Sequence, residues 1–276
     1  MSRPPSRLTG DGRMTSASGR DRFGIASAVH VTEDILAALA KSASPLDLAA
    51  LMTDITRELG FRYYALIHHA DLRGSPRHRI KLLDYPKPVE ERIIGNGTWR
   101  RDPVIRACAF THRAFSWSEI PDIIHLDRRD RDCLEFGGRS GLSEGITVPC
   151  HLLGDYTASC TFAGSETPRW AGRQLGMAQM IGTFAFQAAR RLSCGDQQPS
   201  PPPRLHPRLR DCIILVGRGY SNKEIARALS ITPRTVDRYL TQARALFDAH
   251  DRTELVVSAI FAGEIGLGEI AKDRSA

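Results

Sequence analysis

The sequence predicts an α+β protein, in which an N-terminal α/β/α sandwich on an antiparallel sheet is followed by a C-terminal all-α domain. Two observations carry this prediction. Short runs rich in β-branched and aromatic residues alternate with amphipathic helical segments in the first two thirds of the chain, and only helical segments follow a proline-rich stretch near residue 200. The 276 residues can form two hydrophobic cores, and 42% hydrophobic with 25% charged residues is ordinary for a soluble protein.

Composition divides the chain into four segments. Residues 1–25 are rich in Arg, Ser, Gly and Pro and poor in apolar residues, which is typical of a disordered tail. Residues 194–206 read CGDQQPSPPPRLH, in which four prolines favour an extended, semi-rigid linker. These boundaries leave two folded domains, at residues 26–193 and 207–270.

Two helices are expected in the first folded domain. One covers residues 44–60, with Ser44 as its N-cap and Gly60 at its end. The second covers residues 167–192, with Thr167 as its N-cap. Its apolar periodicity predicts a buried face formed by Met177, Ile181, Phe184, Ala188 and Leu192.

Four strands are expected between these helices. Residues 62–69 and 79–85 read as consecutive strands, and residues 145–153 and 156–164 as a hairpin that turns at Gly154. The order of elements predicts helices packed on both faces of an antiparallel sheet. Such an arrangement can hold an apolar pocket between its layers.

The C-terminal domain contains two helix starts only eleven residues apart. Ser221 and Glu224 form a capping box, and Thr232 caps a second helix that has Pro233 at its first position and ends near Phe247. The second helix has an apolar face at Val236, Leu240, Ala243 and Phe247. Its opposite face carries Arg234, Asp237, Arg238, Thr241 and Arg244. Two short helices joined by a tight turn, the second basic on its free face, indicate a helix-turn-helix.

Charge supports a nucleic-acid partner. The net charge is +7 and the pI about 9.3, and residues 204–245 hold nine basic residues against three acidic ones. The sequence has no apolar run long enough for a membrane span and no secretory signal, which predicts a cytoplasmic protein without a membrane partner. The six cysteines and nine histidines lack metal-ligand spacing, so we expect no metal or cofactor, mostly buried thiols, and His68 and His69 facing partners or solvent.

The stretch GYSNKEIARALSITPRTVDRYL, followed by HDRTELVVSAI, resembles the four-helix DNA-binding domain of LuxR-family transcription factors over roughly residues 205–268. The resemblance implies a homodimer on double-stranded DNA with a two-fold operator. Four residues are expected to contact phosphates: Lys223, Arg234, Thr235 and Arg244. Three are expected to reach base edges: Asp237, Arg238 and Thr241.

One departure from the family pattern concerns the first helix of this domain. The family opens it with Leu-Thr-x-Arg-Glu, whereas this chain reads LHPRL, with His206 and Leu209 where the threonine and glutamate would stand. Losing that capping box should cost about 1 kcal/mol, partly offset by Pro207 at the first helical position. We therefore expect weaker docking of this helix with the fold retained.

A second set of motifs resembles the acyl-homoserine-lactone-binding domain of the same family. The motifs are DYPKPVEERI, RDPV, FSW and GLSEGITVP, at ungapped family spacing. Five positions carry the family's pocket residues: Tyr85, Asp102, Pro103, Trp117 and Gly145. Two positions differ, since Val89 stands where the family has its lactone-binding tryptophan and Ile93 where it has a tyrosine. The resemblance implies a small apolar signal molecule that contains an acyl amide.

Each residue has a role that its chemistry explains. Asp102 could accept the amide N–H of the ligand while the Tyr85 hydroxyl donates to its carbonyl, because a buried unpaired polar group costs about 1–3 kcal/mol. Trp117 would pack on the head group, and Gly145 would allow close approach. Val89 removes an indole N–H, so we hypothesise a head group that is less polar than a homoserine lactone or differently oriented.

Simpler interpretations remain open for the same residues. Tyr85 and Trp117 could be core aromatics, and Asp102 followed by Pro103 is a good helix start in its own right. The pocket could also be a filled core, in which case the chain would be a ligand-independent regulator. An enzyme using Asp102 as acid or base is not expected, because no activated nucleophile, metal spacing or phosphate loop accompanies it.

Overall fold

The computed structural model describes residues 32–70, 79–95, 97–152, 155–164, 175–194 and 203–271, without the side chains of Ile94 and Cys194. The predicted N-terminal tail, the turn at Gly154, the Thr167 cap and most of the proline-rich linker lie outside these residues. Within the described ranges, no helix combines the length and the apolar character that a membrane span requires.

An antiparallel sheet forms the centre of the N-terminal domain. Its strand order is β2-β1-β5-β4-β3, and every neighbouring pair is antiparallel. The strands are β1 (Tyr63–His68), β2 (Lys81–Asp84), β3 (Phe115–Ser116), β4 (Gly145–Cys150) and β5 (Ala158–Ala163). The four predicted strands are confirmed. The two-residue β3 was not predicted, because it is too short for an alternating pattern.

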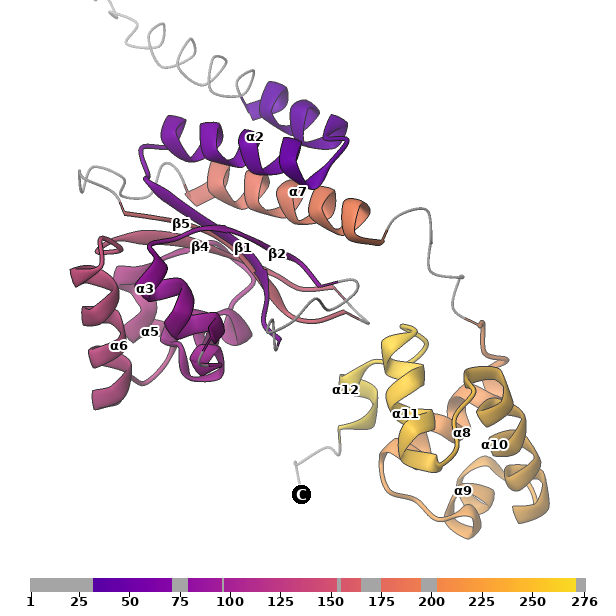
Figure 1. Ribbon diagram of the computed structural model, residues 1–276. Helices are drawn as coiled ribbons and strands as arrows, with labels where there is room; N and C mark the ends of the chain where they lie inside the picture. The colour runs from indigo at the N-terminus through magenta and orange to yellow at the C-terminus, as the bar shows by residue number, and fades with distance from the viewer. Residues whose placement is uncertain are drawn as a thin grey trace, which may run out of the picture.

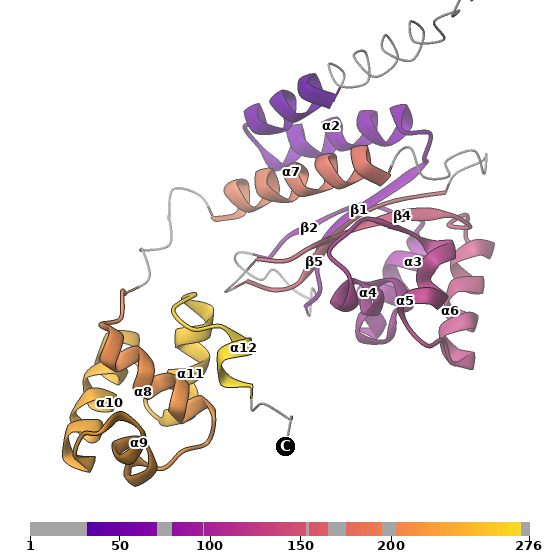
Figure 2. The same ribbon diagram turned by 180° about the vertical axis from the view of Figure 1, so that it is seen from behind.

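Helices cover both faces of the sheet, which confirms the predicted sandwich (Figure 1). One face packs against α2 (Pro45–Glu58) and α7 (Leu175–Cys194), and Figure 2 shows the same layers from behind. Residues 32–41 are also helical. The other face carries short helices: α3 (Lys87–Glu90), the π-helix η1 (Glu91–Gly95), the 3-10 helices η2 (Thr98–Arg101), η3 (Cys108–Phe110) and η4 (Trp117–Glu119), then α4 (Pro103–Ala107), α5 (Ile120–Ile123) and α6 (Arg128–Arg139).

The α2 helix begins and ends as predicted. The Ser44 hydroxyl accepts a hydrogen bond from the Asp47 N–H at 3.1 Å, Pro45 occupies the first helical position, and Gly60 adopts a positive φ of 77° just beyond the end. The Ser44 cap and Gly60 are both signals that can be identified from neighbouring residues. The apolar face of α2 between them is buried in the main core of the N-terminal domain.

The predicted buried face of α7 is wrong at one position. Phe184 is 39% exposed, whereas its neighbour Ala185 is fully buried. The reason is close packing on the sheet, since a Cβ built on Gly182 would lie 2.8 Å from Val148. The helix therefore meets β4 through Gly182 and nearby alanines, which turns the larger Phe184 side chain away.

The prediction that His68 faces a partner or solvent is also wrong. This side chain is only 2% exposed, and its Nδ1 accepts a hydrogen bond from the Ile80 N–H at 3.1 Å. Its neighbour His69 is partly buried, and its Nε2 lies 2.9 Å from the Ser159 hydroxyl. His68 is the last residue of β1 and His69 follows it directly. Both rings form hydrogen bonds with residues of the same domain.

The C-terminal domain is all-α and has its own core. Its helices are α8 (Pro207–Gly217), α9 (Asn222–Leu229), α10 (Pro233–Phe247), α11 (Arg252–Phe261) and the short α12 (Leu267–Ile270). Fully or nearly fully buried apolar side chains from α8 to α11 meet at the centre, among them Ile213, Ile225, Val236, Leu240 and Leu255. The capping box at Ser221 and the Thr232 cap are both present, as predicted.

The first helix of this domain, α8, packs into the core although its side-chain cap is missing. The His206 side chain makes no capping hydrogen bond, as expected, but Leu209 is only 3% exposed. Arg210 pairs with both carboxylate oxygens of Glu269 at 2.7 and 2.8 Å and donates to the Glu264 carbonyl at 2.8 Å. These tertiary contacts join α8 to the C-terminal end of the domain, and the expected cost of the missing cap stays a prediction.

Candidate ligand pocket and DNA interface

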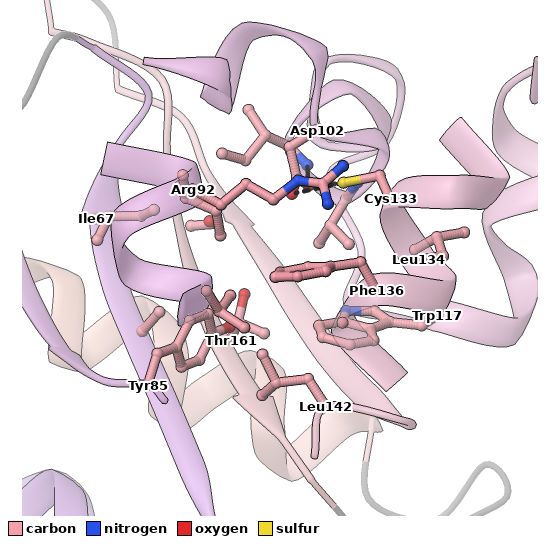
Figure 3. A pocket seen from close by; sticks show the side chains of 17 residues that line it. Ile67, Tyr85, Arg92, Asp102, Trp117, Cys133, Leu134, Phe136, Leu142 and Thr161 are labelled. Atoms are coloured by element: carbon pink, nitrogen blue, oxygen red, sulfur yellow. Dashed lines mark hydrogen bonds between the residues drawn. The ribbon is translucent and has the colours of Figure 1, made fainter. Parts of the chain in front are cut away.

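A narrow cavity lies between the sheet and the short helices of its second face. The cavity has a volume of about 60 Å³ and is lined by side chains from β1, β5, α3, η1, α4 and α6. Since one water needs about 10–15 Å³, this volume has room for only a few water molecules. Figure 3 shows Tyr85, Asp102, Trp117 and Phe136 around it. A larger molecule would enter only if lining side chains moved apart.

Five of the seven predicted pocket residues line this cavity: Tyr85, Val89, Ile93, Asp102 and Trp117. The other two support the lining. Pro103 is buried at the first position of α4, and Gly145 lies directly against the Trp117 ring. Their roles in binding a ligand stay predictions, but the ungapped spacing of the motifs brings all seven positions to one region.

Asp102 fills one of the two roles that the sequence analysis left open, and its ligand-binding role stays a prediction. Its Oδ1 accepts hydrogen bonds from the Val104 and Ile105 N–H groups at 2.9 and 3.2 Å, so it caps α4. Its other oxygen, Oδ2, lies 3.9 Å from the Cys133 sulfur at the cavity edge. Burial raises the pKa of the carboxyl, opposed by the two backbone N–H groups and by Arg92.

Tyr85 follows β2 directly and extends into the cavity near Thr161. Burial raises the pKa of its hydroxyl well above the usual value, with a smaller contribution of the same sign from Asp102. The hydroxyl therefore stays protonated and can donate a hydrogen bond to a ligand carbonyl.

Trp117 is held by a hydrogen bond and by close packing. Its indole N–H donates to the Thr147 hydroxyl at 3.0 Å, and that hydroxyl lies 3.1 Å from the Thr161 hydroxyl. A Cβ built on Gly145 would lie 2.6 Å from Cε2 of the indole, which leaves room for glycine only. Because its N–H is used by Thr147, Trp117 contributes the face of its ring to the cavity lining.

Several lining residues were missed by the sequence analysis: Arg92, Cys133, Leu134, Phe136, Leu142, Ser159 and Thr161. Three of them belong to α6, a helix that was not predicted. Its start was readable, because Asp127 and Asp130 form a capping box. Ser159 and Thr161 alternate along β5, and this period-2 pattern of polar residues in a predicted strand was a second available signal.

The predicted DNA-contacting residues belong to α9 and α10. Lys223, Arg234, Asp237, Arg238 and Thr241 are exposed, and Thr235 and Arg244 are partly buried. The last two are engaged within the domain. The Thr235 hydroxyl lies 2.9 Å from that of Thr232, and Arg244 donates to Thr241 at 3.2 Å. The surface offers basic and polar groups to a ligand, as a recognition helix does.

One arginine joins α11 to the start of α9. Arg252 donates to the Asn222 side-chain oxygen at 2.7 Å and to the Tyr220 carbonyl at 2.8 Å. It belongs to the Arg-Thr-Glu motif on which the resemblance was based. The sequence analysis gave it no role, because its partners lie about thirty residues earlier.

Comparison with known proteins finds a matching family for each of the two domains. The autoinducer binding domain family matches residues 44–192, which is more than half of the chain, and sigma-70 region 4 matches residues 203–247. The crystal structure of Escherichia coli SdiA has the same fold, with a TM-score of 0.56 and 17% sequence identity over 88% of this chain and 99% of SdiA.

Two relatives are transcriptional regulators. BjaR1, a transcriptional activator protein of Bradyrhizobium diazoefficiens, is 32% identical over 161 residues, which are 58% of this chain and 65% of BjaR1. RpaR, a quorum sensing-dependent transcriptional regulator of Rhodopseudomonas palustris, is 33% identical over 168 residues, which are 60% of this chain and 67% of RpaR. The chain thus spans about two thirds of the length of these relatives. It belongs to the family of LuxR-type regulators that carry an autoinducer-binding domain.

Proposed function

We propose that this protein is a ligand-responsive, sequence-specific transcriptional regulator that senses an N-acyl-homoserine lactone or a related acyl amide. The observation that carries the proposal is the cavity, in which Tyr85, Asp102 and Trp117 from three separate segments converge in a chain that also presents a basic helix-turn-helix. In this proposal the active form is a cytoplasmic homodimer on a two-fold DNA operator.

The cavity chemistry supports an acyl amide. Asp102 uses Oδ1 as a helix cap, which leaves Oδ2 to accept an amide N–H. The protonated Tyr85 hydroxyl can donate to the amide carbonyl, and the apolar residues around them suit an acyl chain. Because the cavity is narrow, a ligand must separate side chains that now touch. Binding is then coupled to the stability of the domain by mass action.

On DNA, the exposed residues divide into two roles. Lys223, Arg234, Thr235 and Arg244 would hold phosphates, whereas Asp237, Arg238 and Thr241 would contact base edges. Arg238 is the most informative of these, since an arginine that reads a guanine contributes about 1–3 kcal/mol of discrimination between bases.

A selection from random duplexes tests the DNA half of the proposal. The full chain, with and without acyl amides present, would be used to enrich an operator, and affinities would be measured at several salt concentrations. Lys223→Ala should weaken binding to all duplexes alike and lower the salt dependence by about one ion. Arg238→Ala should instead flatten the preference for the operator over other duplexes.

A matched control is Arg131→Ala, an exposed arginine on α6. It should leave operator affinity unchanged. Equal loss of affinity for Lys223→Ala, Arg238→Ala and Arg131→Ala, or no salt-dependent binding to any duplex, would contradict the proposal.

A second candidate is a ligand-independent regulator of the same family. The small cavity volume of about 60 Å³ and the nearly complete burial of Val89, at 4% exposed, favour it. The two candidates differ in one measurement. Protein purified without any acyl compound, and shown by mass spectrometry to carry none, should bind the operator at full affinity only if no ligand is required.

A further inference from the structure

One positively charged side chain, Arg92, lines the mostly apolar cavity. Arg92, in the π-helix η1, extends across one end, with its guanidinium carbon 4.4 Å from the centre of the Phe136 ring. Figure 3 shows the guanidinium beside Asp102 and Cys133. Stacking on the aromatic ring holds the guanidinium at the cavity rather than away from it.

This guanidinium has no anionic partner of its own among the described residues. Asp102 is close enough for Arg92 to lower its pKa, yet the two side chains form no ion pair. The Asp102 Oδ1 is already occupied by the two N–H groups of α4. A partly buried guanidinium that contacts an aromatic ring and lies near a carboxyl already used as a helix cap can still bind an anionic group.

The surroundings of Arg92 are basic. A second, open hollow adjoins the cavity and shares Arg92 and Cys133 with it. Its lining includes five arginines, namely Arg92, Arg100, Arg101, Arg106 and Arg129, against three aspartates, Asp127, Asp130 and Asp132. Of these acids, Asp130 is paired with Arg106 at 2.7 Å. An excess of positive charge beside the cavity raises the local concentration of anions.

We propose that the pocket recognises an acyl amide that bears a carboxylate, with Arg92 as the residue that determines this specificity. The inference rests on the proposed function, because it assumes that the cavity binds an acyl amide. It differs from the hypothesis of a head group that is less polar than a homoserine lactone or differently oriented, which did not consider Arg92. A guanidinium binds a carboxylate through two parallel N–H···O hydrogen bonds, which a neutral lactone cannot form.

In this proposal Arg92 and Asp102 bind different groups of the ligand. Arg92 binds the carboxylate of the head group at the basic end of the cavity, and Asp102 accepts the amide N–H through Oδ2. Val89 and Ile93 line the cavity with Arg92 and are smaller than the two aromatic residues of the family, so they would obstruct the head group less once the lining side chains move apart. The acyl chain extends along the apolar lining between β1 and α6.

The test uses the full chain and a matched pair of probes. N-acyl-glycine carries a carboxylate, N-acyl-glycinamide is its neutral counterpart, and N-acyl-homoserine lactone is the third probe, each with acyl chains from butanoyl to dodecanoyl. Affinity would be measured by calorimetry and by the shift in melting temperature. We expect the wild-type protein to bind the glycine compound about tenfold or more tightly than the glycinamide at the best chain length.

Variants at Arg92 separate charge from packing. Arg92→Met keeps an unbranched side chain against Phe136 and should abolish the preference by weakening only the carboxylate probe. Arg92→Lys should restore part of the preference, because a lysine keeps the charge without the two-pronged geometry. Arg131→Met, on the exposed face of α6, should leave all affinities unchanged.

The outcomes distinguish this inference from the proposed function. Tighter binding of the lactone or glycinamide than of the glycine compound, or an equal effect of Arg92→Met on all probes, would overturn the inference and leave acyl-amide sensing intact. A failure of every probe to bind would overturn both.

Discussion

The two domains of this protein are stabilised in different ways. In the C-terminal domain, α9 and α10 each begin at a side-chain cap whose partner lies within three residues, and the core comes from one stretch of about sixty residues. In the N-terminal domain, Tyr63 pairs with Ala163 across β1 and β5, so that the sheet joins residues one hundred positions apart. Its cavity is likewise assembled from distant segments.

This difference predicts different responses to substitution. A change in a cap acts on one helix, whereas a change in the N-terminal core acts on the sheet, the cavity and both helical layers together. The two domains should therefore unfold in separate transitions, and each substitution should move only the transition of its own domain. The following substitutions test this, in order of expected effect.

The largest effect is expected from Phe162→Ala. Phe162 is fully buried in β5, and its neighbours belong to the N-terminal core. The cavity left behind should lower the free energy of unfolding of that domain by about 3–5 kcal/mol. Denaturant unfolding, followed by circular dichroism with site-resolved hydrogen exchange, should show one transition displaced. Ile213→Ala in the C-terminal core is the reciprocal control, and a shift of both transitions by either variant would refute independent unfolding.

Gly145→Ala should have the next largest effect. The added methyl group would overlap the Trp117 ring, so the ring must move and lose its hydrogen bond to Thr147. Overpacking of this kind costs about 1–3 kcal/mol. We expect lower N-terminal stability and weaker binding of acyl amides in thermal unfolding experiments.

The control for this change is Gly138→Ala in α6, where the nearest atom, Cα of Ser143, would lie 3.9 Å from the new Cβ. Alanine in a helix interior is favourable, so this variant should be as stable as the wild type or slightly more stable. If Gly145→Ala behaved like this control, the close contact with Trp117 would not determine the shape of the cavity.

These examples show which parts could be predicted from sequence. Ser44, Ser221 and Thr232 were identified as caps because both partners of each hydrogen bond lie within three residues. The strands were predicted because their residues alternate or are continuously apolar. The positions of Tyr85, Asp102 and Trp117 at one cavity came from family spacing and not from any local signal.

The features that the sequence analysis misplaced or missed have a common physical cause. Phe184 and Ala185 both continue the apolar pattern of α7, and the contact of Gly182 with Val148 in another element decides which of them is buried. The role of Arg92 depends on Phe136, which lies 44 positions later in a helix that was not predicted. Long-range packing determined each of these features, and a single sequence carries no direct record of it.

A change in pH should destabilise the N-terminal domain through His69. Its folded-state pKa is lowered from 6.5 to about 3, mainly by burial and to a smaller extent by the neighbouring His151 and His68. As the pH falls below 6.5, the unfolded chain takes up the proton first, so stability is fully present above 6.5 and declines toward 3. Between about pH 7 and about pH 5 the loss should be about 2 kcal/mol.

His69→Gln removes the titration while keeping a side chain that can hydrogen-bond to Ser159. In this variant the pH dependence of N-terminal unfolding should be flatter by that amount. His125→Gln, at an exposed position, is the matched control and should keep the wild-type slope. An unchanged slope in His69→Gln would mean that another group causes the acid sensitivity.

The smallest effect is expected from removing one N-cap serine in each domain. This pair of substitutions is also the most direct test of the difference between the two domains. Ser44→Ala removes the cap of α2, and Ser221→Ala removes the cap of α9. Each should cost about 1 kcal/mol, and only in its own domain. Because α9 precedes the basic surface of α10, Ser221→Ala should also weaken operator binding slightly, whereas Ser44→Ala should not. Threonine at either position keeps the hydroxyl and should restore most of the stability. A loss of operator affinity in Ser44→Ala as large as that in Ser221→Ala would mean that the fold of the N-terminal domain controls DNA binding even without ligand.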